Sequence, residues 1–149
     1  MAKFVYKMEN ILGIKFKMEE QAKTEYGIAR MKLTEEENKL FKLNQKLVMF
    51  HNKLRQSMEE RLNILNIRQG QEAIKIIRMQ ITAQQIEVKK AQQNLEFSRA
   101  KLNKAILERK THEKLKENAF DEFKKEFEAT EQTEINELVS FKFNNPTVN

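Results

Sequence analysis

Side chains that could carry out metal, acid–base or nucleophilic chemistry are few in this 149-residue chain. The absence of cysteine excludes a thiolate nucleophile, a cysteine zinc site and a disulfide framework. Two histidines, His51 and His112, are too few for a histidine-built metal site. We therefore expect no catalytic residue, no metal site and no cofactor site.

Residues that form turns and loops are equally scarce. The chain contains three glycines, one proline and a single aspartate, Asp121, although turns depend on such residues for their backbone conformations. Phosphate-cradling loops need clustered glycines, and the chain has no Walker-type Gly-Lys segment. A fold of few, long elements is therefore expected, and an enzyme is not.

Two long segments carry an apolar repeat of seven, which is typical of coiled-coil helices. In the first segment the repeat occupies Met8, Leu12, Lys15, Glu19, Ala22, Tyr26, Ala29, Leu33, Glu36, Leu40, Leu43, Leu47, Phe50 and Leu54. In the second it occupies Ile74, Ile77, Ile81, Gln84, Val88, Ala91, Leu95, Ser98, Leu102 and Ala105. We call these positions the seam. Beyond Ala105 the repeat turns polar, until an aromatic stripe of Phe120, Phe123 and Phe127 restores it.

The pattern predicts an all-α fold in which two long helices form an antiparallel coiled-coil hairpin, a single domain over 1–149. We expect the first helix over about 3–59, a bend over about 60–70, the second helix over about 71–138 and a frayed tail over 139–149. The frame of the repeat slips between about 56 and 72, and a stutter in one continuous helix would produce the same slip as a reversal.

Complementary side-chain sizes favour the reversal. In an antiparallel pair, large seam residues of one segment face small ones of the other, as with Leu102 opposite Ala29 and Leu40 opposite Ala91. A shift of one heptad preserves this complementarity, so the register stays open. One register sets Glu19 opposite His112, a polar pairing that would fix the register rather than perform chemistry.

Two apolar surpluses lie outside the seam. Residues 4–18 hold nine apolar or aromatic side chains, and three uses stay open for them: an anionic membrane surface, a protein socket, or a thicker core with Phe120 and Phe123. Ile76 and Met79 form the second surplus, which is either a partner patch or ordinary exposure. The net charge is +6, but acidic residues interleave with the basic ones, which disfavours nucleic-acid binding.

The start KFVYKMENILGIKFKMEEQAKTEYGIA (residues 3–29) resembles the opening of the flagellar FliJ family. Further blocks similar to that family are ERKTHEKLKE (108–117) and EQTEINELVSFKF (131–143). Their order, spacing and total length carry the resemblance over nearly the whole chain. It implies a non-enzymatic antiparallel coiled coil, similar to the central stalk of rotary ATPases, in the flagellar type III export apparatus.

The resemblance also implies partners and contact residues. Family members act with the export ATPase ring, link it to the membrane export gate FlhA and bind export chaperones. The end that enters the ring would carry Phe4, Tyr6, Ile11, Phe123 and Phe127. The gate contact of the family matches Ala73, Ile77, Gln80 and Gln84, although Ala73 stands where a larger side chain is common.

We accordingly expect a monomeric, non-enzymatic adaptor of flagellar protein export, without nucleic acid. No apolar run of signal-peptide or membrane-span type is present, so the expected location is the cytoplasm, with peripheral association through partners at the inner membrane of the flagellar base. Two rivals stay open: a generic coiled-coil adaptor or stalk of a related secretion system or rotary ATPase, and a basic helix pair that binds membrane surfaces or nucleic acid.

Overall fold

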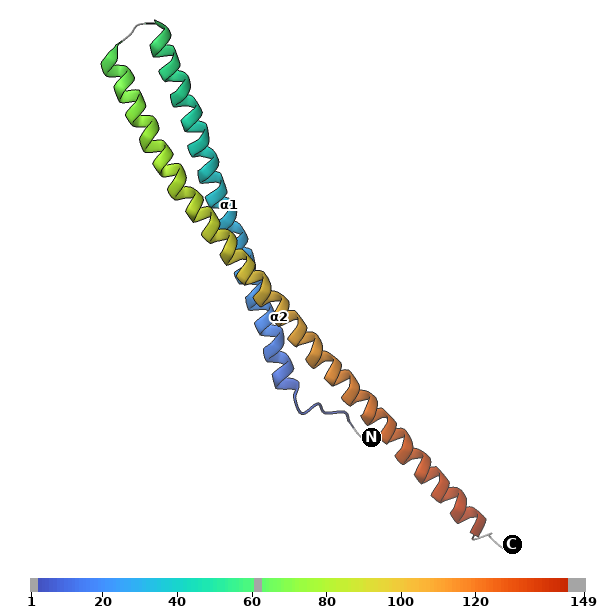
Figure 1. The fold of residues 1–149 in the computed structure, drawn as a ribbon. Coiled ribbons are helices and arrows are strands. Elements are labelled where there is room, and N and C mark those ends of the chain that lie inside the picture. Colours follow the sequence, from blue (N-terminus) through green and yellow to red (C-terminus); the bar gives the residue numbers. More distant parts are fainter. Residues whose placement is uncertain (1–2, 61–62, 145–149) are drawn as a thin grey trace. The chain divides into compact units, whose positions relative to one another are not determined.

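A computed structural model describes residues 3–60 and 63–144. Helix α1 runs from Glu9 to Glu60 and helix α2 from Ile64 to Asn144 (Figure 1), and the described residues contain no strand. The chain divides into two compact units, one formed by residues 1–19 and 104–149 and the other by residues 20–103. Both units contain segments of both helices.

Local chemistry explains where the helices begin. The backbone N–H of Glu9 donates to the carbonyl of Tyr6 at 3.2 Å, and the Glu9 carboxylate stands in the first turn, where the helix dipole favours negative charge. Asn63 caps α2, because its side-chain oxygen accepts from the N–H of Leu65 at 3.1 Å. Its carbonyl accepts from Ile67 at 3.0 Å, which starts the helical ladder.

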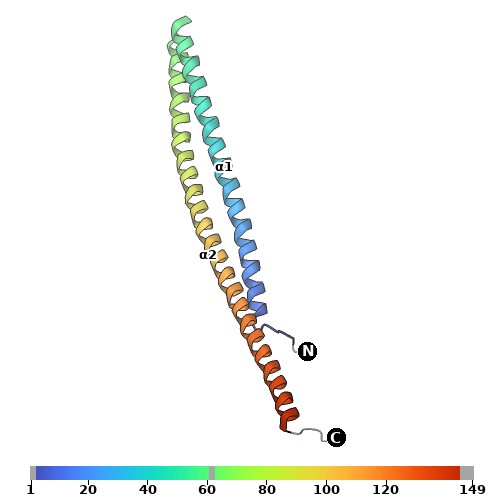
Figure 2. The same cartoon turned by 90° about the vertical axis from the view of Figure 1, so that its right-hand side faces the viewer.

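In the unit of residues 20–103, α1 and α2 lie side by side and run in opposite directions (Figures 1 and 2). Glu25, early in α1, pairs with Lys101 at 2.9 Å, whereas Leu54, late in α1, lies beside Gly70. The chain reverses between Glu60 and Ile64. The predicted all-α hairpin is therefore confirmed.

The seam forms the contact between the helices. Every predicted seam residue of α2 is buried or half-buried, and so is every one of α1 within that helix. The exception among the predicted seam residues is Met8, which precedes α1 and is 44 % exposed. The buried apolar side chains are Leu12, Ala22, Ala29, Ile74, Ile77, Ile81, Val88, Ala91 and Ala105. Because the seam is one layer deep, none of the large described side chains is fully enclosed.

The register is the alternative shifted by one heptad from the Ala29–Leu102 pairing. That pairing, extended toward the bend, would set Leu54 opposite Ile77. Instead, a Cβ built at Gly70 lies 2.9 Å from Leu54 Cδ1, so Leu54 faces the position one heptad earlier. Only a glycine leaves Leu54 this space, which is how the small residue serves the packing.

The element bounds differ from the sequence prediction in three places. α1 begins at Glu9 rather than near residue 3, and α2 begins at Ile64, so Gly70 lies inside a helix rather than in the bend. No described glycine has a positive φ, so none is needed for a turn. α2 also continues through 139–144 of the expected tail, with Lys142 favourably placed in its last turn, while 145–149 lie outside the described residues.

Two glycine substitutions test the packing of the seam. A Cβ at Gly27 meets nothing within 4 Å, so Gly27→Ala should raise the free energy of unfolding by about 1 kcal/mol through helix propensity alone. Gly70→Ala should gain clearly less, because Leu54 must change rotamer to admit the new methyl group. Urea unfolding followed by circular dichroism measures both. Equal gains would contradict the close approach of Leu54 to Gly70.

Candidate protein-interaction surfaces

An aromatic cluster joins the segment before α1 to α2 in the unit of residues 1–19 and 104–149. The ring of Phe4 lies 5.2 Å from that of Phe120, edge to face, and 5.4 Å from that of Phe123. Phe123 in turn stacks on Phe127 at 6.3 Å. These separations are those of favourable aromatic pairs. Phe4 of the amino-terminal surplus therefore packs against α2, whereas Val5, Ile14 and Met18 of the same surplus are exposed.

The cluster contains three of the five residues that the resemblance assigns to the ring-entering end, Phe4, Phe123 and Phe127. The other two, Tyr6 and Ile11, are half-buried nearby in sequence and have no ring contact among the described residues. Phe120 belongs to the same cluster but was not assigned to that end. The sequence could have indicated this, because Phe120 lies three residues before Phe123 and therefore on the same face of α2.

Next to the cluster in sequence, an ion network crosses between the helices. Arg109 donates from Nε to Glu19 at 2.7 Å and from Nη1 to Glu113 at 2.8 Å, and its guanidinium lies 5.7 Å from the ring centre of Phe16. The hydrogen bond to Glu19 is the main cause that raises the pKa of Arg109. Glu19 is only 6 % exposed, so this pair fixes the register of the polar part of the seam.

Further cross-helix contacts are ionic as well. Lys15 Nζ donates to Glu108 at 3.1 Å, and this bond lowers the pKa of that carboxyl group. The register that would set Glu19 opposite His112 is not the one observed, and Arg109 binds the Glu19 carboxylate. His112 Nδ1 is buried without a hydrogen-bond partner. No group of three or more potential metal ligands occurs in the described ranges.

The last part of α2 has no helix beside it. All residues from 128 to 144 are exposed, and both views show this end of α2 continuing alone within its unit (Figures 1 and 2). Large apolar side chains stand on it, with exposed fractions of 52 % for Ile135, 63 % for Leu138 and 65 % for Phe141. The same segment carries four glutamates, at positions 128, 131, 134 and 137. We call residues 128–144 the unpaired end of α2.

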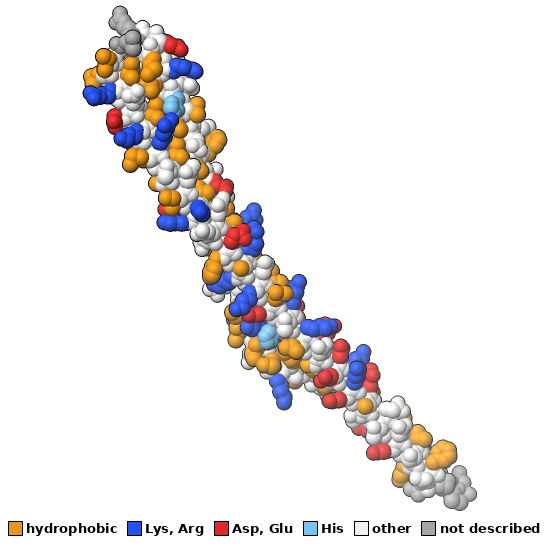
Figure 3. Space-filling view, in the orientation of Figure 1, with side chains coloured by type: hydrophobic (Ala, Val, Ile, Leu, Met, Phe, Trp, Pro, Cys, Tyr) orange, Lys and Arg blue, Asp and Glu red, His pale blue; other side chains and the backbone are white. Residues whose placement is uncertain are grey.

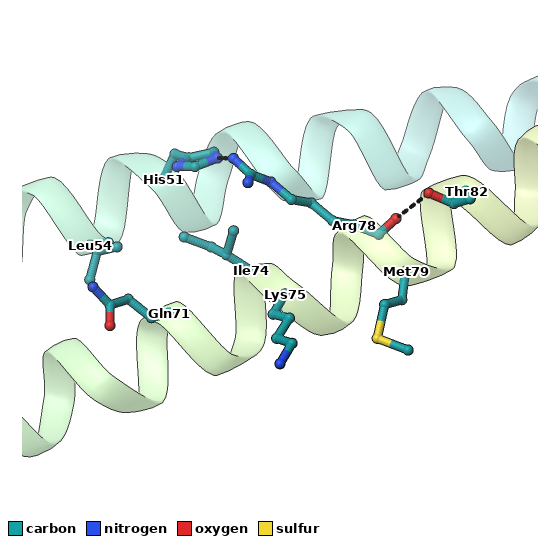
Figure 4. Close-up of a pocket in the computed structure, with 8 residues that line it drawn as sticks. All are labelled: His51, Leu54, Gln71, Ile74, Lys75, Arg78, Met79 and Thr82. Atoms are coloured by element: carbon teal, nitrogen blue, oxygen red, sulfur yellow. Dashed lines mark hydrogen bonds between the residues drawn. The ribbon is translucent and has the colours of Figure 1, made fainter.

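A groove lies between the helices close to the bend, within the unit of residues 20–103 (Figure 4). Ile74 and Leu54 point into it, while Arg78 reaches across to His51 Nε2 at 3.4 Å. Met79 is 66 % exposed and projects away from α1, as does Lys75.

The four residues matched to the family's gate contact follow one face of α2, at the seam and along its edge. Ile77 is only 2 % exposed in the seam, and Gln84 donates to the carbonyl of Glu36 at 3.0 Å and to its carboxylate. Ala73 is half-buried, and Gln80 is exposed. In the hairpin, Ile77 and Gln84 serve the contact with α1, which leaves Gln80 and the edge of Ala73 accessible.

The comparisons agree with this geometry. The family model described as "Flagellar FliJ protein" matches residues 4–147. The chain belongs to the FliJ family. Among solved structures, CT670 of Chlamydia trachomatis, described as a YscO homolog, matches with 21 % identity and a TM-score of 0.55, over 95 % of this chain and 96 % of that one. No curated protein matches.

Membership of the FliJ family supports a stalk-like protein of flagellar export. The likeness to CT670 shows a shared fold. None of the described helical residues forms a stretch long and apolar enough to cross a membrane.

Removal of the Phe4 ring should loosen the start of α1. Phe4→Ala loses contacts with two rings, each of which contributes about 1 kcal/mol, so amide hydrogens of residues 9–15 should exchange several-fold faster. Hydrogen exchange with mass spectrometry measures this. Val5→Ala is the control, since Val5 is 74 % exposed. Equal protection in Phe4→Ala and the wild type would contradict the cluster.

The lowered pKa of Glu36 should make the stability of the protein sensitive to acid. Hydrogen bonds from Lys32 and Gln84 lower the pKa of Glu36 to about 2 from an ordinary value near 4.5. A carboxyl group with a lowered pKa contributes stability above pH 4.5 and loses it as the pH falls toward 2. The wild type should therefore have a higher Tm than Glu36→Gln at pH 7, and the difference should shrink between pH 4.5 and 2.5.

The control is Glu37→Gln, because Glu37 is exposed on the same helix. Its Tm should follow that of the wild type throughout the acid range. A difference between the wild type and Glu36→Gln that stays constant from pH 7 to 2.5 would refute the bonded carboxylate.

Proposed function

We propose that this FliJ-family chain is a stalk that engages the flagellar export ATPase ring through the free end of its hairpin. It links the ring to the membrane export gate FlhA and to export chaperones. By these contacts it is held on the cytoplasmic face of the inner membrane at the flagellar base. Its own chemistry is binding alone, as a monomer.

The observation that carries the proposal is the unpaired end of α2. A helix of this length in water without a packing partner is marginally stable on its own. Exposed Ile135, Leu138 and Phe141 on it form apolar surface that no other described segment covers. The central opening of a ring of subunits surrounds a single helix on all sides. The unpaired end of α2, which is exposed all the way round, could be contacted in this way.

The aromatic cluster supports the same end as the ring-binding one. It fixes the segment before α1 onto α2 just before the unpaired end begins, so that Phe4 and Phe127 belong to one packed unit. Side chains held by ring contacts lose little further entropy on binding. The cluster therefore gives the free helix a rigid base.

The link to the gate is proposed for the bend-proximal part of α2. Gln80 is exposed there, and Ala73 is half-buried along a groove beside Phe50 and Gly70. Contacts at two separate places would let one chain bind the ring and the gate together. Coupling between the two sites would require that each partner changes the affinity for the other.

A stalk of a related secretion system is the second candidate. The fold shared with CT670, a YscO homolog, favours it over the other rivals. The two candidates have the same geometry and differ in the ATPase that binds. Purified flagellar export ATPase that neither binds the chain nor responds to it would favour this second candidate.

Apolar substitutions in the unpaired end should abolish engagement of the ATPase without unfolding the chain. We expect the triple variant Ile135→Gln, Leu138→Gln and Phe141→Gln to lose at least tenfold in affinity for the flagellar export ATPase and to stop stimulating its ATP hydrolysis. The side chains are more than half exposed, so the Tm should change little. Pull-down and phosphate-release assays measure the effect.

The matched control replaces equally exposed apolar residues of α1, Met31→Gln, Phe41→Gln and Val48→Gln. This variant should bind and stimulate the ATPase as the wild type does. Full stimulation by the triple variant of the unpaired end, or an equal loss in both variants, would refute the proposed contact.

A further inference from the structure

A second apolar stripe runs along α2 outside the seam. It consists of positions two residues after successive seam residues: Ile76, Met79, Ala83, Ile86, Lys90, Gln93, Phe97 and Ala100. We call these eight positions the outer stripe. Six of the eight are apolar, and their spacing alternates between three and four residues, as in a coiled-coil seam. All of them belong to the unit of residues 20–103.

The outer stripe lies on the face of α2 opposite α1. Two residues correspond to about 200° around an α-helix, so each position points away from the seam residue that precedes it. All eight are exposed, with fractions of 53 % for Ile76, 66 % for Met79, 54 % for Ile86 and 69 % for Phe97. Figure 4 shows Met79 projecting from α2 on the side away from α1. A helix that packs on one side only normally has a polar opposite face.

The charges beside the outer stripe are mostly basic. Lys75 and Lys89 flank it, and Lys90 lies within it. Two acids also flank it, but Glu87 already pairs with Lys90 at 3.5 Å and Glu96 with Arg99 at 3.2 Å. Within the described ranges, no carboxylate forms an ion pair with Lys75 or Lys89. Figure 3 shows basic side chains interspersed with apolar ones on one face of the molecule near the bend.

We propose that the outer stripe docks one acidic amphipathic helix of another protein, which packs on α2 as a third coiled-coil strand. Two apolar residues in each heptad make a line that one helix covers. From Ile76 to Ala100 the line measures about 36 Å, which fits a partner helix of about 25 residues. Ala83 and Ala100 leave room for its large side chains, and glutamates on its flanks would meet Lys75 and Lys89.

Two other occupants fit less well. A second copy of this chain would bring its own Lys75 and Lys89 to the interface, so that like charges would oppose docking. A membrane surface would favour a broad apolar face, whereas Lys90 and Gln93 interrupt this narrow line. The proposal is independent of the ring contact, because the outer stripe and the unpaired end share no residue.

A designed peptide tests the proposal with the full chain. The probe is a fluorescent 28-residue helix with leucine at the apolar heptad positions and glutamate at the flanks, whose own charges keep it monomeric at neutral pH. A matched probe carries lysine at the flanks. By fluorescence anisotropy, the chain should bind the acidic probe at least tenfold more tightly than the basic one, and added salt should reduce the difference.

Substitutions locate the binding. Met79→Gln, Ile86→Gln and Phe97→Gln together should weaken the acidic probe at least tenfold, whereas the α1 control Ile28→Gln, Phe41→Gln and Val48→Gln should not. Lys75→Glu with Lys89→Glu should remove or reverse the preference between the probes. Circular dichroism should show each variant as helical as the wild type, and a variant that loses helix is replaced by Ile86→Gln alone.

Several outcomes would overturn the proposal. These are no binding of the acidic probe, equal affinity for both probes, or binding that the outer-stripe variant leaves unchanged. Self-association in sedimentation that the same variant abolishes would assign the stripe to a second copy. Binding to anionic phosphatidylserine vesicles that the variant abolishes, without binding of the peptide, would assign it to a membrane.

Discussion

The structure depends on the contact along one seam between two antiparallel helices. That seam is a single layer deep, and small residues such as Ala22, Ala29 and Ala91 make up much of its buried part. Burial of so little apolar surface per residue gives a modest stabilisation, which must offset the ordering of a long chain. Polar groups inside the seam therefore matter for specificity. The Glu19–Arg109 pair and the Glu36–Gln84 bond hold one register among several that the apolar pattern alone would accept.

The same thin seam explains where partners can bind. Each helix uses one face for the other helix, so its remaining surface is open along its whole length. Exposed apolar side chains occur on both helices, and those of the unpaired end of α2 and of the outer stripe stand at regular spacing. In a hairpin without an enclosed core, the binding surfaces are stripes along a helix and the ends of helices rather than enclosed pockets. Such surfaces suit helices and rings of other proteins more than small ligands.

The sequence predicted the seam position by position, because burial in a coiled coil follows the period of seven directly. It did not predict the register, since alanine and leucine alternate in a way that tolerates a shift of one heptad. It also made the bend too long, since the predicted bend extended to residue 70, whereas α2 begins at Ile64 and Gly70 makes room for Leu54 within the helix. Ile77 and Gln84, assigned by resemblance to the gate, are seam residues, a position that their period already indicated. The assignment itself stays a prediction. The sequence prediction identified Ile76 and Met79 as apolar residues outside the seam. It did not identify the rest of the outer stripe, which repeats with the same spacing as far as Phe97 and Ala100.

The most direct test of the hairpin is a distance between spin labels, since the chain has no cysteine and labels can be introduced singly. Glu25→Cys with Lys101→Cys places two labels at a pair that the structure joins across the helices at 2.9 Å between side-chain atoms. Dipolar spectroscopy should find a short distance that persists when labelled protein is diluted with unlabelled protein. When the second label moves from position 101 to Gln80, the measured distance should grow by up to about 30 Å, the length of helix between these two positions. Coupling between positions 25 and 101 that disappears on dilution would mean that the paired helices come from different copies, which would contradict the hairpin.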